Sequence, residues 1–464
     1  MIYQTIDQLK QNMTNTLRID EGDVIVSDEK RLRDTLINDL VYSAIFSPDD
    51  EVKASAQWLI RRAGAQLGCM PCSIQPLYEA MGNGNISGFT VPAINLRGIT
   101  YHSAQAVFRA ALRNRTGAFI FEIARSEIGY TDQRPSEYAT VITAAAIRTG
   151  YSGPLFLQGD HFQINANKYS EGPDAEVRAI KVLIREAIEA GFYNIDIDAS
   201  TVVNLDRPTI REQQEGNYSI TADMTAMIRE IEPEGVTVSV GGEIGEIGNK
   251  NTTVEEFTVF MDNYLKELCG KGEGLKGISK ISIQTGTTHG GVPLPDGTIA
   301  KVKIDFDTLE RISQVARSEY GLSGAVQHGA STLPNEAFDK FPETGTSEIH
   351  LATGFQNIIY DSTHFPAVLR DRIYAFINTE LRNEKKEKDT EEQFIYKTRK
   401  KGFGRFKKDM WDLPQDILDA IGAELEGQFS FLFNRLNLSG TRDTTDGLVK
   451  LIDIPMDLPS SLAQ

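Results

Sequence analysis

The sequence predicts an α/β protein built on a (β/α)₈ TIM barrel, with helical extensions at both ends. Within residues 73–365, short apolar runs alternate with stretches of helical periodicity. Repeated strand–helix alternation indicates a parallel sheet, and eight such units are typical of a closed barrel. Polar or small residues follow most of these runs, as expected where a barrel assembles its active site. A doubly wound open sheet is the alternative.

Each predicted strand is a short apolar run. The eight predicted strands are Phe89–Asn95, Ala118–Ile123, Leu155–Gln158, Asn194–Asp198, Val236–Val240, Lys280–Gln284, Ala325–His328 and Glu348–Ala352. Helical spacing of apolar residues predicts the intervening helices near 103–115, 136–149, 174–190, 220–232, 253–270 and 307–319.

The two ends of the chain lack this alternation. Residues 1–72 predict a helical N-terminal extension, in which Asp49 and the acidic residues after it open a helix. Residues 366–464 predict a C-terminal helical extension that packs on the barrel or forms subunit contacts. Its strongly charged segment, 382–408, is predicted to be a solvated helix or a mobile loop.

Composition narrows the class of protein. The chain has 464 residues, 40% of them hydrophobic, and a formal net charge of −17. Such a charge repels nucleic acid and anionic membranes, so neither is expected as a partner. We find no apolar run of transmembrane length and no secretory signal at the N-terminus. Three cysteines argue against a disulfide framework. The expectation is a soluble cytoplasmic protein.

Three of the six histidines end apolar, strand-like runs. His161 follows Phe156–Asp160, His289 follows the run from Ile281, and His328 follows the run from Gly324. Imidazole is the commonest protein ligand of zinc, and a catalytic zinc needs three protein ligands and an open position. We therefore predict that His161, His289 and His328 converge on one divalent metal.

Carboxylates accompany these histidines. Asp160 precedes His161, and at a strand-to-loop junction both side chains can face one cavity, where Asp160 moves protons. A helix-capping Asp beside a structural histidine is the alternative. Glu243 lies in a Gly-rich stretch and is either a fourth metal ligand or a residue that orients a histidine. Asp198, at another strand end, is expected to line the cavity.

The sequence resembles the class II, metal-dependent ketose-bisphosphate aldolases, which act on fructose or tagatose bisphosphate. The segments that carry the resemblance occur in the family's order. They are Val91–Asn95, Gly159–His161, Gly242–Gly245, Gly286–Gly290, Ile304–Leu309 and His328–Ser331 followed by Leu333-Pro334.

The resemblance implies a lyase of carbohydrate metabolism, such as glycolysis, that reversibly cleaves a phosphorylated ketose. It implies zinc, or another divalent metal, held by the three histidines with Glu243 at an alternative position. The metal would stabilise the enediolate left by cleavage as a Lewis acid, and Asp160 would serve as acid and base. The residues implied to contact the sugar phosphate are Asn95, Gly290, Gly329, Ser331 and Thr353. A homo-oligomer is expected.

Four departures from the family pattern concern the substrate. His350 replaces an Asn that contacts the ketose, and the mobile loop lacks its usual Glu, for which Glu246 is the nearest substitute as a catalytic base. The usual Lys after the segment around His289 is missing, and Arg125 follows a position where the family has Ser. Arg125 could bind a carboxylate or a second phosphate. A metal-dependent sugar (phosphate) epimerase and a non-catalytic aldolase-like subunit therefore stay open as alternatives.

Overall fold

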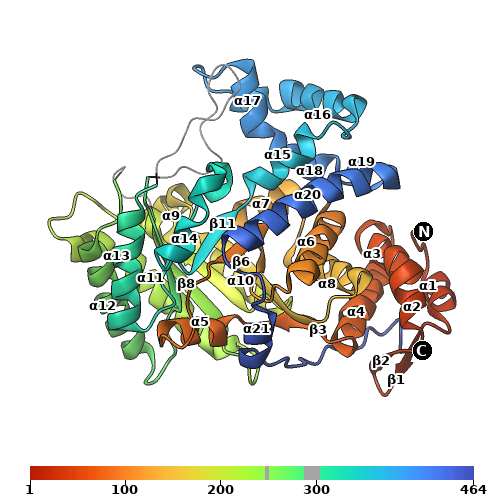
Figure 1. Cartoon of the computed structure of the whole chain (residues 1–464), viewed down its shortest axis with the longest axis horizontal. Helices are drawn as coiled ribbons and strands as arrows, with labels where there is room; N and C mark the ends of the chain where they lie inside the picture. Colours follow the sequence, from red (N-terminus) through yellow and green to blue (C-terminus); the bar gives the residue numbers. More distant parts are fainter. Residues whose placement is uncertain (246–249, 287–303, 464) are drawn as a thin grey trace.

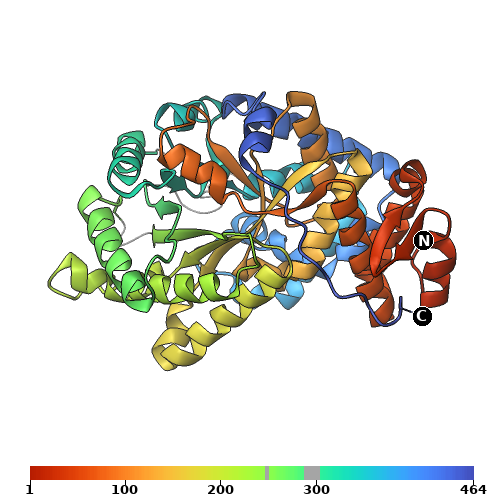
Figure 2. The ribbon, with the colours of Figure 1, turned by 90° about the horizontal axis from the view of Figure 1, so that it is seen from below.

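A closed barrel of eight parallel strands forms the centre of the molecule (Figures 1 and 2). The computed structural model describes residues 1–245, 250–286 and 304–463. The barrel strands, in order around the barrel, are β4 (Val91–Asn95), β5 (Ile120–Ala124), β6 (Gly153–Gln163), β7 (Asn194–Asp198), β8 (Ser239–Gly245), β9 (Lys280–Ile283), β10 (Ala325–Gln327) and β11 (Glu348–Leu351). Each overlaps a predicted strand, so the predicted fold class is confirmed.

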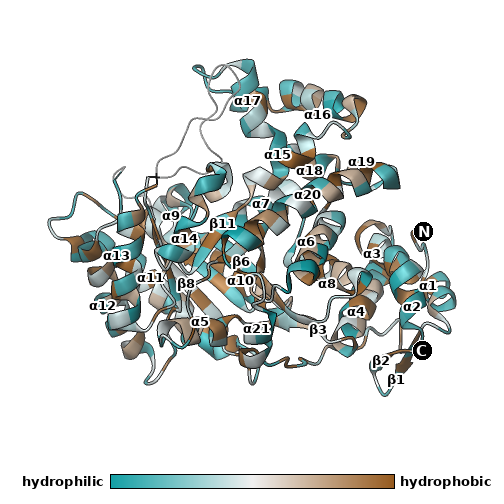
Figure 3. Cartoon of the chain, viewed as in Figure 1, coloured by the Kyte–Doolittle hydropathy of each residue, from teal (hydrophilic) through white to brown (hydrophobic). Residues whose placement is uncertain are grey.

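Helices cover the outside of this barrel. The long ones are α6 (Thr100–Asn114), α8 (Pro135–Thr149), α10 (Pro173–Glu189), α11 (Ile210–Ile231), α12 (Val254–Lys271) and α13 (Phe306–Tyr320). In Figure 3 the outer helices that can be seen carry both hydrophilic and hydrophobic residues. Their apolar residues are buried in one continuous core with the strands. Parallel strands covered in this way are buried on both faces, which explains their near-continuous apolar runs.

The inside of the barrel, in contrast, is charged. Lys280 and Glu348 are at most 1% exposed, and Lys280 Nζ lies 3.0 Å from Asp196 Oδ2 and 2.8 Å from Gln158 Oε1. Lys280 also pairs with Glu348. Charges buried this deeply are tolerated only when they are paired and hydrogen-bonded. These charged residues can be seen in the strand sequences, but their contact inside the barrel cannot be predicted from them.

The N-terminal part contains more strand than the sequence predicts. Its helices are α1 (Ile6–Met13), α2 (Glu29–Arg31), α3 (Ile37–Phe46), α4 (Asp50–Gln66) and α5 (Gln75–Gly82), with a π-helical turn at Leu32–Leu36. The antiparallel pair β1 (Leu17–Asp20) and β2 (Asp23–Val26) was not expected. Strand β3 (Cys69–Cys72) pairs with the first four residues of β6. That pairing adds Gly153 and Pro154 to the predicted strand, and pairing with β7 extends its other end to Gln163.

The C-terminal part folds back over the rest of the chain. Helix α20 (Gln415–Arg435) packs against α6 and α15 (Thr353–Asp361). The segment after α21 (Arg442–Leu448) then runs to α4, where Arg62 Nη1 lies 2.6 Å from Asp453 Oδ1. Both termini consequently lie on the same side of the molecule (Figures 1 and 2). None of the helices in the described ranges has the length and apolar character that a membrane span requires.

Residues 382–388 are mostly exposed, as predicted for the charged segment 382–408, but the remainder is neither a solvated helix nor a free loop, so the prediction is wrong for that remainder. It forms α17 (Glu391–Thr398), a 3₁₀ turn (η6, Arg399–Lys401), α18 (Gly402–Arg405) and the start of α19 (Lys407–Trp411). The turn and α18 pack against α7 (Arg125–Thr131), beside the barrel mouth. Arg399 and Lys407 are buried because each finds an acidic partner, Asp361 and Glu137 respectively.

Candidate active site

A β-bulge turns Asp160 and His161 into the barrel mouth. The register between β6 and β7 shifts between Gly159 and Phe162, and His161 has a φ of 40°. A bulge places one extra residue in a strand, so neighbouring side chains no longer point to opposite faces. The left-handed backbone at a residue other than Gly costs on the order of 1 kcal/mol and is typical of functional sites. Both side chains line one cavity, as predicted.

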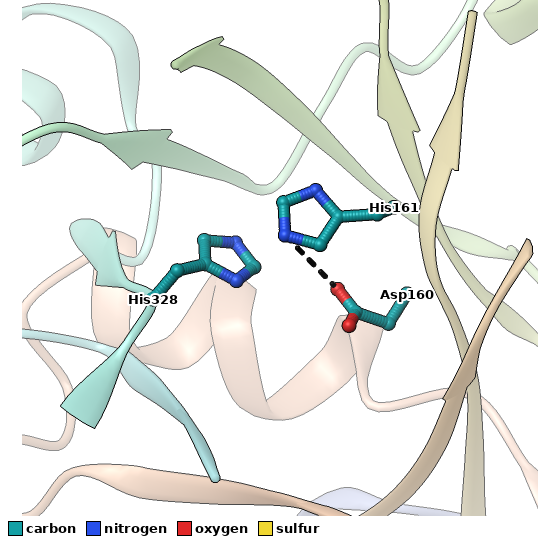
Figure 4. Close-up of side chains that lie close together, drawn as sticks. All are labelled: Asp160, His161 and His328. Carbon is teal, nitrogen blue, oxygen red and sulfur yellow. Dashed lines mark ion pairs between the residues drawn. The ribbon is translucent and has the colours of Figure 1, made fainter. Parts of the chain in front are cut away.

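His328 meets this pair from the end of β10 (Figure 4). The ring centroids of His161 and His328 are 4.1 Å apart, and Ser282 Oγ lies 3.0 Å from Nε2 of His328. One donor atom each from Asp160, His161 and His328 lie within 4.8 Å of one another. Two of the three predicted histidine ligands are thus brought together. Predicted residues His289, Gly290 and Glu246 lie outside the described residues.

Two carboxylates hold the far side of the His161 ring. Its Nδ1 lies 2.9 Å from Glu243 Oε2 and 3.1 Å from Asp198 Oδ2. A proton on Nδ1 can be donated to these oxygens, and Nε2 then faces Asp160, whose Oδ1 lies 3.9 Å away. Glu243 thus lies where a residue that orients the His161 ring would lie. His161, Asp198 and Glu243 could also bind an ion directly. Burial and then the charge of Asp198 raise the pKa of Glu243 to about 7.

His350 forms the floor of the cavity. Its ring centroid is 3.9 Å from that of His328, and its Nδ1 lies 2.8 Å from Glu122 Oε2 and 3.2 Å from Asp160 Oδ1. Nε2 lies 2.7 Å from Glu348 Oε1. Burial opposes a charge on this ring, but Glu122 and Asp160 outweigh it and raise the pKa of His350. His350, which the sequence predicts to contact the substrate, is therefore surrounded by carboxylates.

The carboxylates around His350 differ in charge state. Burial and then the nearby Asp160 raise the pKa of Glu122 to about 8. Burial also favours the neutral form of Glu348, but Lys280 and His350 together lower its pKa to about 2. Glu122 can thus carry a proton near neutral pH while Glu348 is ionised. No sequence pattern pointed to Glu122, although a carboxylate within a predicted buried strand is itself a signal.

The cavity has a volume of about 430 Å³. Asn95, Gly329, Ser331 and Thr353, all predicted to contact the sugar phosphate, line it. Ser331 Oγ accepts a hydrogen bond of 2.7 Å from the backbone N–H of Ala352, immediately before α15 begins. Gly329 has a φ of 71°, which favours glycine. This edge of the cavity therefore combines a small-residue turn with a helix N-terminus, an arrangement suited to anions.

Arg125 lines the same cavity, but its charge is already paired. Its guanidinium forms an ion pair with Glu176 and donates a 2.7 Å hydrogen bond to the backbone carbonyl of Gln163. It is therefore less available for a substrate anion than its sequence context indicated.

Sequence reasoning missed three basic residues of the cavity wall. Arg97, Lys168 and Lys400 all line it. Arg97 pairs with Glu127, which in turn accepts a hydrogen bond from Asn95. Arg97 lies just two residues beyond Asn95 and could have been noticed. Lys400 could not, because nothing local places the charged C-terminal segment at the barrel mouth.

Comparison with known proteins shows the family of the chain. Residues 76–420 match the model of the family described as fructose-bisphosphate aldolase class-II. No curated protein matches the sequence significantly. Among solved structures, a probable tagatose 6 phosphate kinase from Sinorhizobium meliloti 1021 has a TM-score of 0.54 at 17% identity, over 81% of this chain and 96% of the other. The fructuronate-tagaturonate epimerase UxaE from Cohnella laeviribosi has a TM-score of 0.52 at 13% identity, over 96% of this chain and 90% of the other.

At these identities, both structures show a shared fold and no more. A fructose-bisphosphate aldolase from Campylobacter jejuni is also similar, with a TM-score of 0.48 at 18% identity, over 80% of this chain and 97% of the other. The family model matches well over half of the chain and includes every barrel strand. The protein belongs to the class II fructose-bisphosphate aldolase family.

Proposed function

We propose that this protein is a zinc-dependent aldolase that reversibly cleaves a phosphorylated ketose. The observation that carries the proposal is the convergence of Asp160, His161 and His328, from two different strands, within one cavity. Family membership supports the reaction class. The anion-suited edge at Ser331 and Thr353 supports a phosphorylated substrate.

The residues present suit a divalent metal. Imidazole nitrogen is a ligand of zinc, and the donor atoms of His161 and His328 lie within 4.8 Å of one another. Asp198 and Glu243 fix the ring of His161, as carboxylates commonly do for histidines that bind metal. When bound, a divalent ion would polarise the ketose carbonyl as a Lewis acid.

Asp160 is the proposed acid and base. In cleavage its carboxylate removes the proton of the C4 hydroxyl, and in synthesis it returns that proton. The carboxylate is 5% exposed and lines the cavity. His350, 3.2 Å away, holds its Oδ1 in place. Ser331 and the backbone N–H groups at Thr353 would bind the substrate phosphate and fix the ketose relative to Asp160.

The test is a cleavage assay with fructose 1,6-bisphosphate, tagatose 1,6-bisphosphate and their monophosphates. We expect a triose phosphate product from at least one ketose, loss of turnover with chelator, and recovery with zinc. Zinc content should be measured on the same samples. Failure of every ketose phosphate to be cleaved, at full zinc occupancy, would contradict the proposal.

An epimerase is the second candidate. The epimerase from Cohnella laeviribosi shares the fold over almost the whole of both chains, extensions included. The same assays decide between the two, because an epimerase converts a ketose or keto acid into its stereoisomer without a triose product. Full metal occupancy with neither product would favour a non-catalytic subunit.

A further inference from the structure

The C-terminal extension contributes one side chain to the cavity, and this side chain carries an unbalanced charge. Lys400 lines the cavity together with Arg97 and Tyr130. It is half-buried, and among the described residues its ammonium has no ion pair or hydrogen bond; it lies 5.4 Å from the centroid of the Tyr130 ring. Burial and then the charge of Arg97 lower the pKa of Lys400.

The backbone of Lys400 is held rigidly. The preceding residue, Arg399, donates hydrogen bonds of 2.6 and 3.0 Å to the two carboxylate oxygens of Asp361 and one of 2.8 Å to Asn357 Oδ1. Tyr360 donates a 2.8 Å hydrogen bond to the carbonyl oxygen of Arg399. All three partners belong to α15, the helix whose N-terminus borders the cavity. The 3₁₀ turn is therefore bound to α15 through both the side chain and the backbone carbonyl of Arg399.

Glycines allow the extension to approach the barrel closely. A Cβ on Gly98, next to Arg97, would lie 2.0 Å from the Phe403 ring. A Cβ on Gly404 would lie 2.4 Å from the carbonyl oxygen of Tyr130. Backbone and a buried ring cannot move aside for a methyl group. Together, these contacts make the segment after Thr398 a permanent wall of the cavity.

The two arginines of this wall, unlike Lys400, are already paired with carboxylates. Arg97 forms an ion pair with Glu127, and Arg125 forms one with Glu176. Lys400 therefore adds one net positive charge beside a neutral pair. The floor of the same cavity is rich in carboxylates, which would repel an anionic substrate without a local cation.

We propose that Lys400 and Arg97 form the binding site for a terminal oxyanion of the substrate, a phosphate or a carboxylate. This inference rests on the proposed function and deepens it. The small-residue edge at Ser331 would hold one end of the substrate, and Lys400 would hold an anion at the other. Arg97 keeps a guanidinium edge in the cavity while Glu127 and Gln356 fix its orientation.

Lys400→Met tests the site, with Lys401→Met as the matched control. Lys401 is the next residue in the same turn, but it pairs with Glu384. Because Lys400→Met leaves the substrate oxyanion without its charged hydrogen-bond partner, KM should rise about 10–100-fold. The expected signature is a fall of this size in the ratio of kcat/KM for the bisphosphate over the ketose that lacks the terminal phosphate. A terminal carboxylate is tested with the matching keto-uronate and neutral ketose.

Lys400→Arg separates charge from folding. This variant should recover most of the lost ratio, and the Lys401→Met ratio should match that of the unaltered protein. A fall in kcat with an unchanged ratio would overturn the assignment. So would covalent trapping of Lys400 by borohydride with a ketose, since that would make the lysine a Schiff-base residue.

Binding of inorganic phosphate tests the site without turnover. Calorimetric titration should show phosphate binding weakened about tenfold or more by Lys400→Met and unaffected by Lys401→Met. Ser331→Ala should weaken a separate binding step. Unchanged phosphate binding in Lys400→Met would overturn this inference whether or not the protein is an aldolase. Weakened binding without cleavage of any ketose would leave the anion site standing and contradict only the proposed function.

Discussion

His161 and Glu243 meet across the mouth of the barrel, with Nδ1 of the ring 2.9 Å from Oε2 of the carboxylate. They come from β6 and β8, and Asp198 from the intervening β7 reaches the same nitrogen. One ring is thus oriented by two neighbouring strands. This relationship gives the candidate metal site its defined geometry and leads to the first predictions.

Removal of a histidine should remove the metal. We expect His328→Ala and His161→Ala to lose bound zinc and, with it, all measurable ketose cleavage. Zinc should be measured by elemental analysis after dialysis. His364→Ala is a suitable control, since His364 lies in the loop after α15, away from the cavity. Full zinc retention in both site variants would contradict the metal assignment.

Glu243→Gln should weaken metal binding without removing a metal ligand. An amide of similar shape lacks the charge that makes the His161 ring more basic. We expect a decrease in zinc affinity of about 10–100-fold, measured by competition with a chelator. An effect as complete as that of His161→Ala would instead identify Glu243 as a ligand.

Asp160→Asn should separate proton transfer from metal binding. We expect kcat to fall by about 10²–10⁴-fold, because the amide cannot accept the hydroxyl proton. Zinc content should be unchanged, since His161 and His328 remain. A loss of zinc equal to that in the histidine variants would show that Asp160 is a ligand rather than the base.

His102 should make the folded state sensitive to acid. Burial next to Tyr101 and Trp411 lowers the pKa of His102 to about 4 from an ordinary value near 6.5. Between pH 6.5 and pH 4, His102 therefore binds a proton in the unfolded chain but not in the folded chain. This contribution to stability is complete above pH 6.5 and is lost as the pH falls toward 4, by about 2 kcal/mol at pH 5.

The comparison is between the unaltered chain and His102→Gln, both treated with chelator. Urea unfolding at pH 7.5 and pH 5 should show a smaller acid-induced loss of unfolding free energy in the variant. Equal losses in the two proteins would exclude His102 as the group responsible.

Lys280→Met should destabilise the barrel strongly. The substitution leaves Glu348 and Asp196 buried without their shared cation, at a cost of about 3–5 kcal/mol. The double variant Lys280→Met, Glu348→Gln removes one of those charges and should recover part of this loss. Urea unfolding measures both. Additive effects of the two substitutions would show that the residues do not interact.

Much of the fold could be predicted from the sequence because the patterns that indicate strands and helices are local. Each of the eight strands was predicted from a run of apolar residues, and their order followed from the chain itself. The pair β1 and β2 and strand β3 were missed because residues 1–72 lack the alternation of apolar runs and helices that marks the barrel strands. The second part of segment 382–408 was predicted wrongly, because its charges indicate a solvated segment, whereas Arg399 and Lys407 are buried against acidic partners in distant elements.

The sequence by itself determined the barrel, the candidate site residues Asp160, His161 and His328, and the small-residue edge around Ser331. Only the tertiary structure decided how the side chains meet. The bulge that turns His161 inward, the carboxylates around His350 and the arrival of Lys400 at the cavity all depend on contacts between distant segments. Periodicity records which face of its own element a residue occupies. The distance between side chains of different elements is set by packing, which no local pattern encodes.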